Sequence, residues 1–174
     1  MFCWQITKYN PKYRNADRAY LKDEWTEYGD IGKTFEGKKL TYEEYEKVEE
    51  AHIKAVLLFM DCLGIDSLKV VHLSKDCNHA DSVTVADIKI KNNTYYTREI
   101  IIFIIKSILR YEFWCILEAK SMRVRFEYDY YMLLACKVPC TSIIQQIEQL
   151  GLFVETKGCD FLFDEEDDDT ECCE

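Results

Sequence analysis

The sequence predicts an α+β protein, in which an antiparallel sheet has helices packed on one face. Three observations lead to this fold class. One stretch has the spacing and the caps of a long amphipathic helix, another alternates polar and apolar residues as a strand does, and the regular strand–helix alternation of a parallel sheet is missing. With 174 residues, 48% of them hydrophobic, the chain can bury a core of its own. We therefore expect residues 1–163 to form a single domain.

The clearest helix signal is a capping box at Thr41 and Glu44. The Thr41 hydroxyl and the Glu44 carboxylate can each satisfy a backbone N–H group that is left free at the start of a helix. Apolar residues then recur at three- and four-residue spacing, and Gly64 suits the left-handed position that ends a helix. The pattern predicts a helix over residues 42–63.

The middle of the chain predicts two extended segments and a second helix. Residues 68–73 and 83–90 are rich in β-branched side chains, and the Asn92-Asn93 pair marks a turn. Residues 97–110 are ambiguous, because isoleucine favours strands while the apolar positions trace one helical face. The length of this segment favours a buried helix.

Three closely spaced segments predict an antiparallel meander: 113–119, 122–128 and 130–136. In the middle segment, apolar residues alternate with arginine and glutamate, so we expect one face to be buried. The pattern from Ser142 to Gln145 resembles a second capping box and predicts a short helix ended by Gly151. A last strand is expected over residues 152–156.

The charge balance indicates an acidic protein. A formal net charge of -10 disfavours direct binding to nucleic acid, which requires cations against the phosphates, and favours cationic partners. Many cytosolic proteins are acidic without any charged partner, so the charge alone has a second interpretation. The six consecutive acidic residues 164–169 predict an extended, solvated tail over residues 164–174.

The location expected from the sequence is the cytoplasm. The N-terminus does not resemble a secretory signal, and the longest apolar run is too short to cross a bilayer. In this compartment the nine scattered cysteines are expected to be reduced thiols, mostly small buried hydrophobic residues rather than disulfides.

Catalytic and metal-binding motifs cannot be recognised, which predicts a protein that is not an enzyme and holds no cofactor or metal. Cys77 and His79 lack the paired spacing of a zinc site, and His52 lies on an apolar helix face, where a histidine is usually structural. Neighbouring carboxylates such as Glu49 and Glu50 point in different directions and are interpreted as a solvated face. The alternative is a small cytosolic enzyme or a metal- or ligand-binding domain, with a site assembled from remote acids and from Cys77, His79 and His72.

A candidate partner-binding surface lies in the N-terminal third, where large aromatic residues alternate with carboxylates. We call it the aromatic–acidic surface, and its residues are Tyr20, Asp23, Glu24, Trp25, Glu27, Tyr28 and Asp30. Aromatic side chains supply contact area at low entropic cost, and carboxylates steer basic partners. The alternative is that Trp25 and the tyrosines pin a long loop onto the sheet.

Four short segments of the chain resemble one group of proteins: Trp4–Pro11, Asp23–Thr26, Gly29–Gly32 and Asp129–Met132. They are similar to small bacterial proteins that are encoded beside polymorphic toxins, secreted or contact-dependent, and are regarded as their immunity proteins. The resemblance covers both ends of the chain and supplies no catalytic residues.

The resemblance implies a cytoplasmic protein that binds a cognate toxin, often a nuclease, and blocks its basic active site or substrate surface. An acidic, aromatic surface could imitate the phosphate charge that a nuclease cleft expects. A third interpretation is a regulatory adaptor that binds through the acidic tail, and the sequence indicates no oligomeric state.

Overall fold

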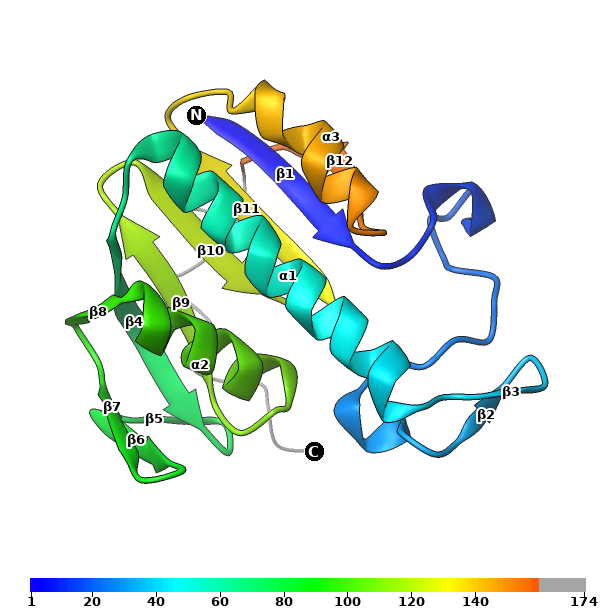
Figure 1. The fold of residues 1–174 in the computed structure, drawn as a ribbon, viewed down its shortest axis with the longest axis horizontal. Coiled ribbons are helices and arrows are strands. Elements are labelled where there is room, and N and C mark those ends of the chain that lie inside the picture. Colours follow the sequence, from blue (N-terminus) through cyan, green and yellow to red (C-terminus); the bar gives the residue numbers. More distant parts are fainter. Residues whose placement is uncertain (160–174) are drawn as a thin grey trace.

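The computed structural model describes residues 1–159 and confirms the predicted α+β class. In this part of the chain, three α-helices lie on the same face of a large antiparallel sheet (Figure 1): α1 (Tyr42–Leu63), α2 (Arg98–Leu109) and α3 (Thr141–Gln149). None of the helices in residues 1–159 is both long enough and apolar enough to cross a membrane. The acidic tail predicted at residues 164–174 lies outside the described residues, as do the last four residues of the predicted domain.

The main sheet has the strand order β12-β1-β11-β10-β9-β4-β5, and β8 also pairs with β4. Its strands are β1 (Phe2–Thr7), β4 (Ser67–Lys75), β5 (Asn78–His79), β8 (Thr94–Thr97), β9 (Trp114–Ala119), β10 (Met122–Phe126), β11 (Tyr131–Cys136) and β12 (Phe153–Thr156). Two small hairpins stand apart: β2 (Thr34–Phe35) with β3 (Lys38–Lys39), and β6 (Ser82–Val85) with β7 (Ile88–Lys91). The pairing of β9 with β10 and of β10 with β11 is the predicted meander.

Helix α1 begins and ends where the sequence predicts. The Thr41 hydroxyl accepts a hydrogen bond from the Glu44 N–H at 3.2 Å, and the Glu44 carboxylate accepts one from the Thr41 N–H at 3.4 Å. Gly64 closes the helix with a φ of 63°, a conformation that costs glycine little because it has no Cβ. The hydrogen bonds between Thr41 and Glu44 fix the helix end that lies beside the N-terminal loops.

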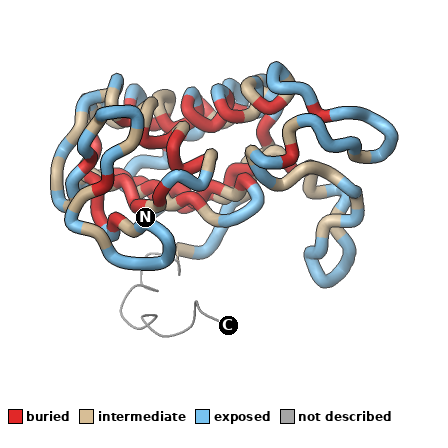
Figure 2. Tube along the Cα trace, turned by 90° about the horizontal axis from the view of Figure 1, so that it is seen from below, coloured by how far each residue is buried: buried red, intermediate tan, exposed pale blue. Residues whose placement is uncertain are grey.

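The core lies between the helices and the sheet. Figure 2 shows the buried residues concentrated in these two layers. Side chains from α1 and α2, such as Phe59 and Ile104, belong to the same buried cluster as Leu117 and Leu134 of the central strands. Since strand side chains alternate between faces, the apolar residues of β10 contact the helices while Arg123 and Arg125 occupy the opposite face.

The structure corrects the predicted single extended segment at residues 83–90. It is a hairpin, β6–β7, which turns at Ala86 and Asp87, both with positive φ. The prediction was wrong because this turn contains neither glycine nor proline, the residues that usually mark it. The strand β1 was not predicted at all, although it pairs with β11 on one side and β12 on the other.

The predicted capping box at Ser142 is also wrong. Helix α3 begins at Thr141, and its N-cap is Cys140, which has a left-handed backbone and makes no side-chain cap hydrogen bond. A disulfide between Cys140 and Cys62 joins the start of α3 to the end of α1. This covalent tie, which sequence spacing could not indicate, accompanies the unusual helix start.

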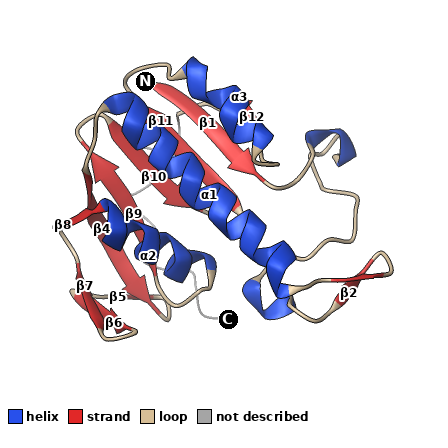
Figure 3. Cartoon of the chain, viewed as in Figure 1, coloured by secondary structure: helices blue, strands red, loops and turns tan. Residues whose placement is uncertain are grey.

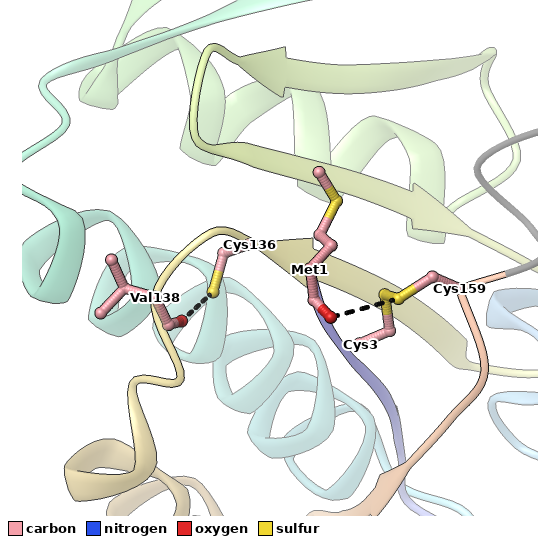
Figure 4. Close-up of a disulfide and its surroundings, with 5 residues drawn as sticks. All are labelled: Met1, Cys3, Cys136, Val138 and Cys159. Carbon is pink, nitrogen blue, oxygen red and sulfur yellow. Dashed lines mark hydrogen bonds between the residues drawn. A yellow bond between two sulfur atoms is a disulfide. The ribbon is translucent and has the colours of Figure 1, made fainter.

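The expectation that the cysteines are reduced thiols is wrong for four of them. Cys3 and Cys159 form a disulfide with Cα atoms 5.6 Å apart, and Cys62 and Cys140 form another with Cα atoms 6.1 Å apart. Figure 4 shows the first, which links β1 to the segment after β12. The partners are 156 and 78 residues apart in sequence, so only the fold reveals that they meet.

The remaining thiols in the described part of the chain follow the prediction more closely. Cys115 and Cys136 are buried, and burial raises the pKa of both thiols. A raised pKa keeps a cysteine in its unreactive thiol form. Cys77 is exposed.

Candidate functional site

The aromatic–acidic surface belongs to the long segment between β1 and α1 (Figure 3). This segment has little regular structure apart from two short 3-10 turns, at Pro11–Tyr13 and Tyr28–Asp30, and the β2–β3 hairpin. It lies beside the N-terminal end of α1 (Figure 1). A loop of this length needs specific anchors, and three sets of contacts hold it.

The first anchor is Lys8, which follows β1 directly. Its ammonium group lies 4.0 Å from the ring centre of Tyr9 and 4.1 Å from that of Trp25, and it pairs with the Glu24 carboxylate at 3.3 Å. The Lys8 side chain is only 5% exposed. Burial lowers the pKa of Lys8 to about 8, although Glu24 acts to raise it. A buried cation thus ties the loop to the edge of the fold.

The second anchor is Asp30. Its carboxylate accepts hydrogen bonds from the backbone N–H groups of Thr26 at 2.8 Å and Glu27 at 3.2 Å, and from the Lys33 ammonium at 2.7 Å. Burial alone would raise the pKa of Asp30, but these donors lower it overall. Asp30 is buried and serves the loop rather than its outer surface.

The third anchor is an aromatic cluster beneath the loop. The ring centre of Trp25 lies 5.6 Å from that of Tyr45 and 4.9 Å from that of Tyr130, and Tyr28 lies 5.0 Å from Tyr45. His52 adjoins Tyr130 at 5.9 Å. Trp25 and Tyr28 therefore pin the loop to α1 and to the turn that carries Tyr130, whereas the alternative interpretation expected the loop to be pinned onto the sheet. Both side chains are half-buried.

His52 is a core residue, in agreement with its sequence interpretation. It is fully buried, with Nδ1 2.8 Å from the Val48 carbonyl oxygen and Nε2 3.2 Å from the Tyr130 carbonyl oxygen. Burial lowers the pKa of His52, and the positive charge of Lys8 lowers it further. The ring joins α1 to the turn that carries Tyr130.

The β10–β11 turn adds residues that sequence reasoning did not assign to the surface. Asp129 and Tyr130 both have positive φ, and the Tyr131 N–H donates to the Tyr128 carbonyl at 3.3 Å. A left-handed tyrosine is strained, and the buried Tyr130 ring, whose hydroxyl donates to Leu109, offsets the strain. The turn leaves Tyr128 74% exposed. In the sequence, the only signal for this turn was Asp129 between two predicted strands.

The outer face at this end is formed by the loop and the turn together. Asp23, Glu27 and Asp129 are exposed, and Tyr20 and Glu24 are half-buried. Tyr111 follows α2 and is 48% exposed. Burial raises the pKa of Tyr111, and the negative charges of Asp129 and Glu27 raise it further. The surface thus combines carboxylates from two distant segments with exposed aromatic rings.

The residues of the alternative site lie elsewhere. Cys77 is in the turn between β4 and β5, His79 is in β5 and His72 is in β4, all exposed. In residues 1–159, no group of three or more histidine, cysteine or acidic side chains is arranged to hold a metal ion. This region therefore gives the metal-binding alternative no geometric support.

Comparisons with protein-family models, with curated proteins and with solved structures find no match to this chain.

Proposed function

We propose that this protein is an immunity protein, which binds a cognate bacterial toxin and neutralises it by covering a basic active-site or substrate surface. The observation that carries the proposal is the joint surface of the N-terminal loop and the β10–β11 turn, where Asp23, Glu27 and Asp129 stand beside exposed tyrosines. Aromatic residues and carboxylates in this combination suit a partner rich in arginine and lysine. The resemblance of the sequence to immunity proteins agrees with this reading.

The rigidity of the surface supports the same proposal. Lys8 and Asp30 fix the loop from within, so binding a partner does not incur the entropic cost of ordering the loop. The net charge of -10 speeds the encounter with a basic protein over long range. Fast, preorganised capture is what a cell needs against an enzyme that damages it. The partner we propose is a basic toxin, most simply a nuclease, rather than nucleic acid itself.

The place of action we propose is the cytoplasm, where a nuclease finds its substrate. The two disulfides are the observation against this location, because cytosolic thiols are normally kept reduced. The measurement is whether these cysteines are paired in protein purified from the cytoplasm under anaerobic conditions. It tests whether the two disulfides are compatible with action in that compartment.

The test of the function is stoichiometric binding of the product of the neighbouring toxin gene. We expect a one-to-one complex and full loss of toxicity at equal concentrations, measured by calorimetry and by a nuclease assay. The charge-reversed pair Asp23→Lys and Glu27→Lys should weaken the complex and make its Kd less sensitive to salt, because fewer screened attractions remain. The same double change at Asp76 and Asp87, exposed acids of distant turns, is the matched control. A toxin that forms no complex with the wild-type protein overturns the proposal.

A further inference from the structure

A small hollow opens between the N-terminal loop and the β10–β11 turn. It has a volume of about 200 Å³ and is lined by Tyr9, Tyr20, Lys22, Glu24, Thr26, Asp129 and Tyr131. We call it the tyrosine hollow. Pockets for small organic ligands are usually about 300–1,000 Å³. The tyrosine hollow therefore has room for one long side chain rather than for a whole cofactor.

The walls of the hollow are aromatic and closely packed. The ring centre of Tyr9 lies 4.8 Å from that of Tyr20 and 5.5 Å from that of Tyr131. The Tyr20 hydroxyl donates to the Glu24 carboxylate at 2.7 Å, which fixes one wall, and the Tyr9 hydroxyl donates to the Trp25 carbonyl at 3.2 Å. Rigid tyrosine walls of this kind contact the stem of a long side chain and accept a cation against a ring face.

The charges at the hollow leave one carboxylate unneutralised. Glu24 is shared with the buried Lys8, and Lys22 lies 4.1 Å from the ring centre of Tyr13 and 4.0 Å from a Glu36 oxygen. Asp129 is exposed and has no cation within ion-pair distance among residues 1–159. Its charge nevertheless reaches into the hollow, since it acts on both Lys8 and Tyr9.

We propose that the tyrosine hollow receives the side chain of one arginine or lysine of the protein partner. Asp129 accepts hydrogen bonds from the cationic group, while Tyr20 and Tyr131 flank its stem. The inference rests on the proposed function, because it names the part of the toxin that the surface holds. A neutral or anionic side chain leaves the Asp129 charge uncompensated and gains nothing from the ring faces.

The hollow can be tested without any toxin, using ethylguanidinium as the probe and N-ethylurea as its neutral isostere. In amide NMR spectra of the full chain, ethylguanidinium should cause saturable shifts at Thr26, Asp129 and Tyr131, and N-ethylurea should not. Asp129→Asn keeps a residue that tolerates positive φ and removes the charge. It should therefore raise the Kd for ethylguanidinium about tenfold. Asp87→Asn, an exposed left-handed aspartate of the β6–β7 turn, is the matched control and should leave the shifts unchanged.

The toxin supplies the second measurement. Asp129→Asn should raise the Kd for the toxin about tenfold, and Asp87→Asn should not change it. Lys22→Gln removes a positive charge from the wall of the hollow and should lower both the Kd for the toxin and that for ethylguanidinium. If the toxin binds normally to Asp129→Asn and ethylguanidinium gives no localised shifts, the hollow is not a cation site, while the proposed function stands. If no toxin binds but the localised shifts appear, the proposed function fails and the hollow stands.

Discussion

The guanidinium of Arg110 donates two hydrogen bonds, at 2.7 and 2.8 Å, to the fully buried carboxylate of Glu49. The Tyr45 hydroxyl donates to the same carboxylate at 3.0 Å, and the Lys106 ammonium lies 3.8 Å away. This arrangement corrects the interpretation of Glu49 as part of a solvated face. It joins α1 to the end of α2 immediately behind the aromatic cluster.

Breaking this pair should destabilise the protein strongly. Arg110→Met leaves the Glu49 carboxylate buried without its main partner, so we expect a loss of about 3 kcal/mol in the free energy of unfolding. The measurement is a urea titration at pH 7. Arg98→Met is the control, because the partner of Arg98, Asp61, is largely exposed and such pairs contribute about 1 kcal/mol or less. Equal losses in the two variants would contradict the assignment.

The positions of Glu49 and His52 show how far sequence patterns reach. Both lie on the face of α1 that carries Tyr45, so the helical spacing that placed His52 in the core applies to Glu49 as well. A carboxylate was assigned to solvent because burying it is costly without a partner. The partner, Arg110, is 61 residues away. Patterns with a period of two or 3.6 predict local elements, and long-range polar pairs leave no such mark.

The stability of the protein should decrease as the pH falls below the usual pKa of histidine, near 6.5. The pKa of His52 is lowered in the folded state, so the unfolded state takes up this proton first and is stabilised by it. The loss is at most about 1.4 kcal/mol per pH unit. Urea titrations at pH 7.5 and 5.5 measure it.

His52→Gln should flatten this pH dependence, whereas the same change at the exposed His79 should preserve it. The charged neighbour that acts on His52 is Lys8, whose lowered pKa of about 8 still lies above this window. A slope that survives in His52→Gln would assign the dependence to other groups.

Lys8 predicts a second pH window, on the alkaline side, in which its contribution to stability again increases with pH. Its pKa falls from 10.5 to about 8 on folding, so between these values the unfolded state binds more protons. Lys8 should therefore contribute a rise in stability with pH from 8 to 9.5, below the ionisation of ordinary tyrosines near 10. The buried thiols of Cys115 and Cys136, whose pKa is raised, contribute a fall over the same range, so the rise due to Lys8 is measured as the difference between the wild type and a Lys8 variant. Lys8→Met should remove the rise due to Lys8, and Lys12→Met, an exposed control four residues after Lys8, should keep it. Free energies of unfolding at pH 8, 8.75 and 9.5 decide the matter.

Trp25→Ala should destabilise the fold itself. Trp25 packs against Lys8, Tyr45 and Tyr130, and the loss of a half-buried indole is expected to cost about 2 kcal/mol. The double variant Asp23→Lys and Glu27→Lys changes only exposed side chains and should stay within about 0.5 kcal/mol of the wild type. Thermal unfolding distinguishes the two variants. If Trp25→Ala leaves the stability unchanged, Trp25 does not pin the loop. The charge-reversed variant is thus the cleaner probe of partner binding.

The two disulfides should stabilise the protein substantially. Chain-entropy arguments give more than about 4 kcal/mol for a cross-link that closes a loop of about 100 residues. Reduction with dithiothreitol should therefore lower Tm, and Cys3→Ala with Cys159→Ala should reproduce part of the decrease. Cys77→Ala, at an exposed free thiol, is the control. Peptide mapping without reductant should recover the pairs Cys3–Cys159 and Cys62–Cys140, and other pairings would contradict the fold.

The candidate site could be predicted from the sequence only in part. The aromatic and acidic residues between positions 20 and 30 do lie together, because they are close in sequence. Their division into buried anchors, such as Asp30, and exposed groups, such as Asp23, depends on what lies beneath the loop. Asp129 reaches the same end through the pairing of Thr7 with Tyr131, and no local pattern reveals a strand register of that kind.

The Cys3–Cys159 bond has a mechanical consequence. Because it joins the first strand to the segment that follows the last one, most of the described chain forms a closed covalent ring. A pulling force applied at either end is carried by a sulfur–sulfur bond. The hydrogen bonds of β1 with β11 and β12 are therefore not broken one after another by that force. A protease that unfolds proteins by pulling them through a pore from one end would have to translocate two lengths of polypeptide at once, or stall at this disulfide.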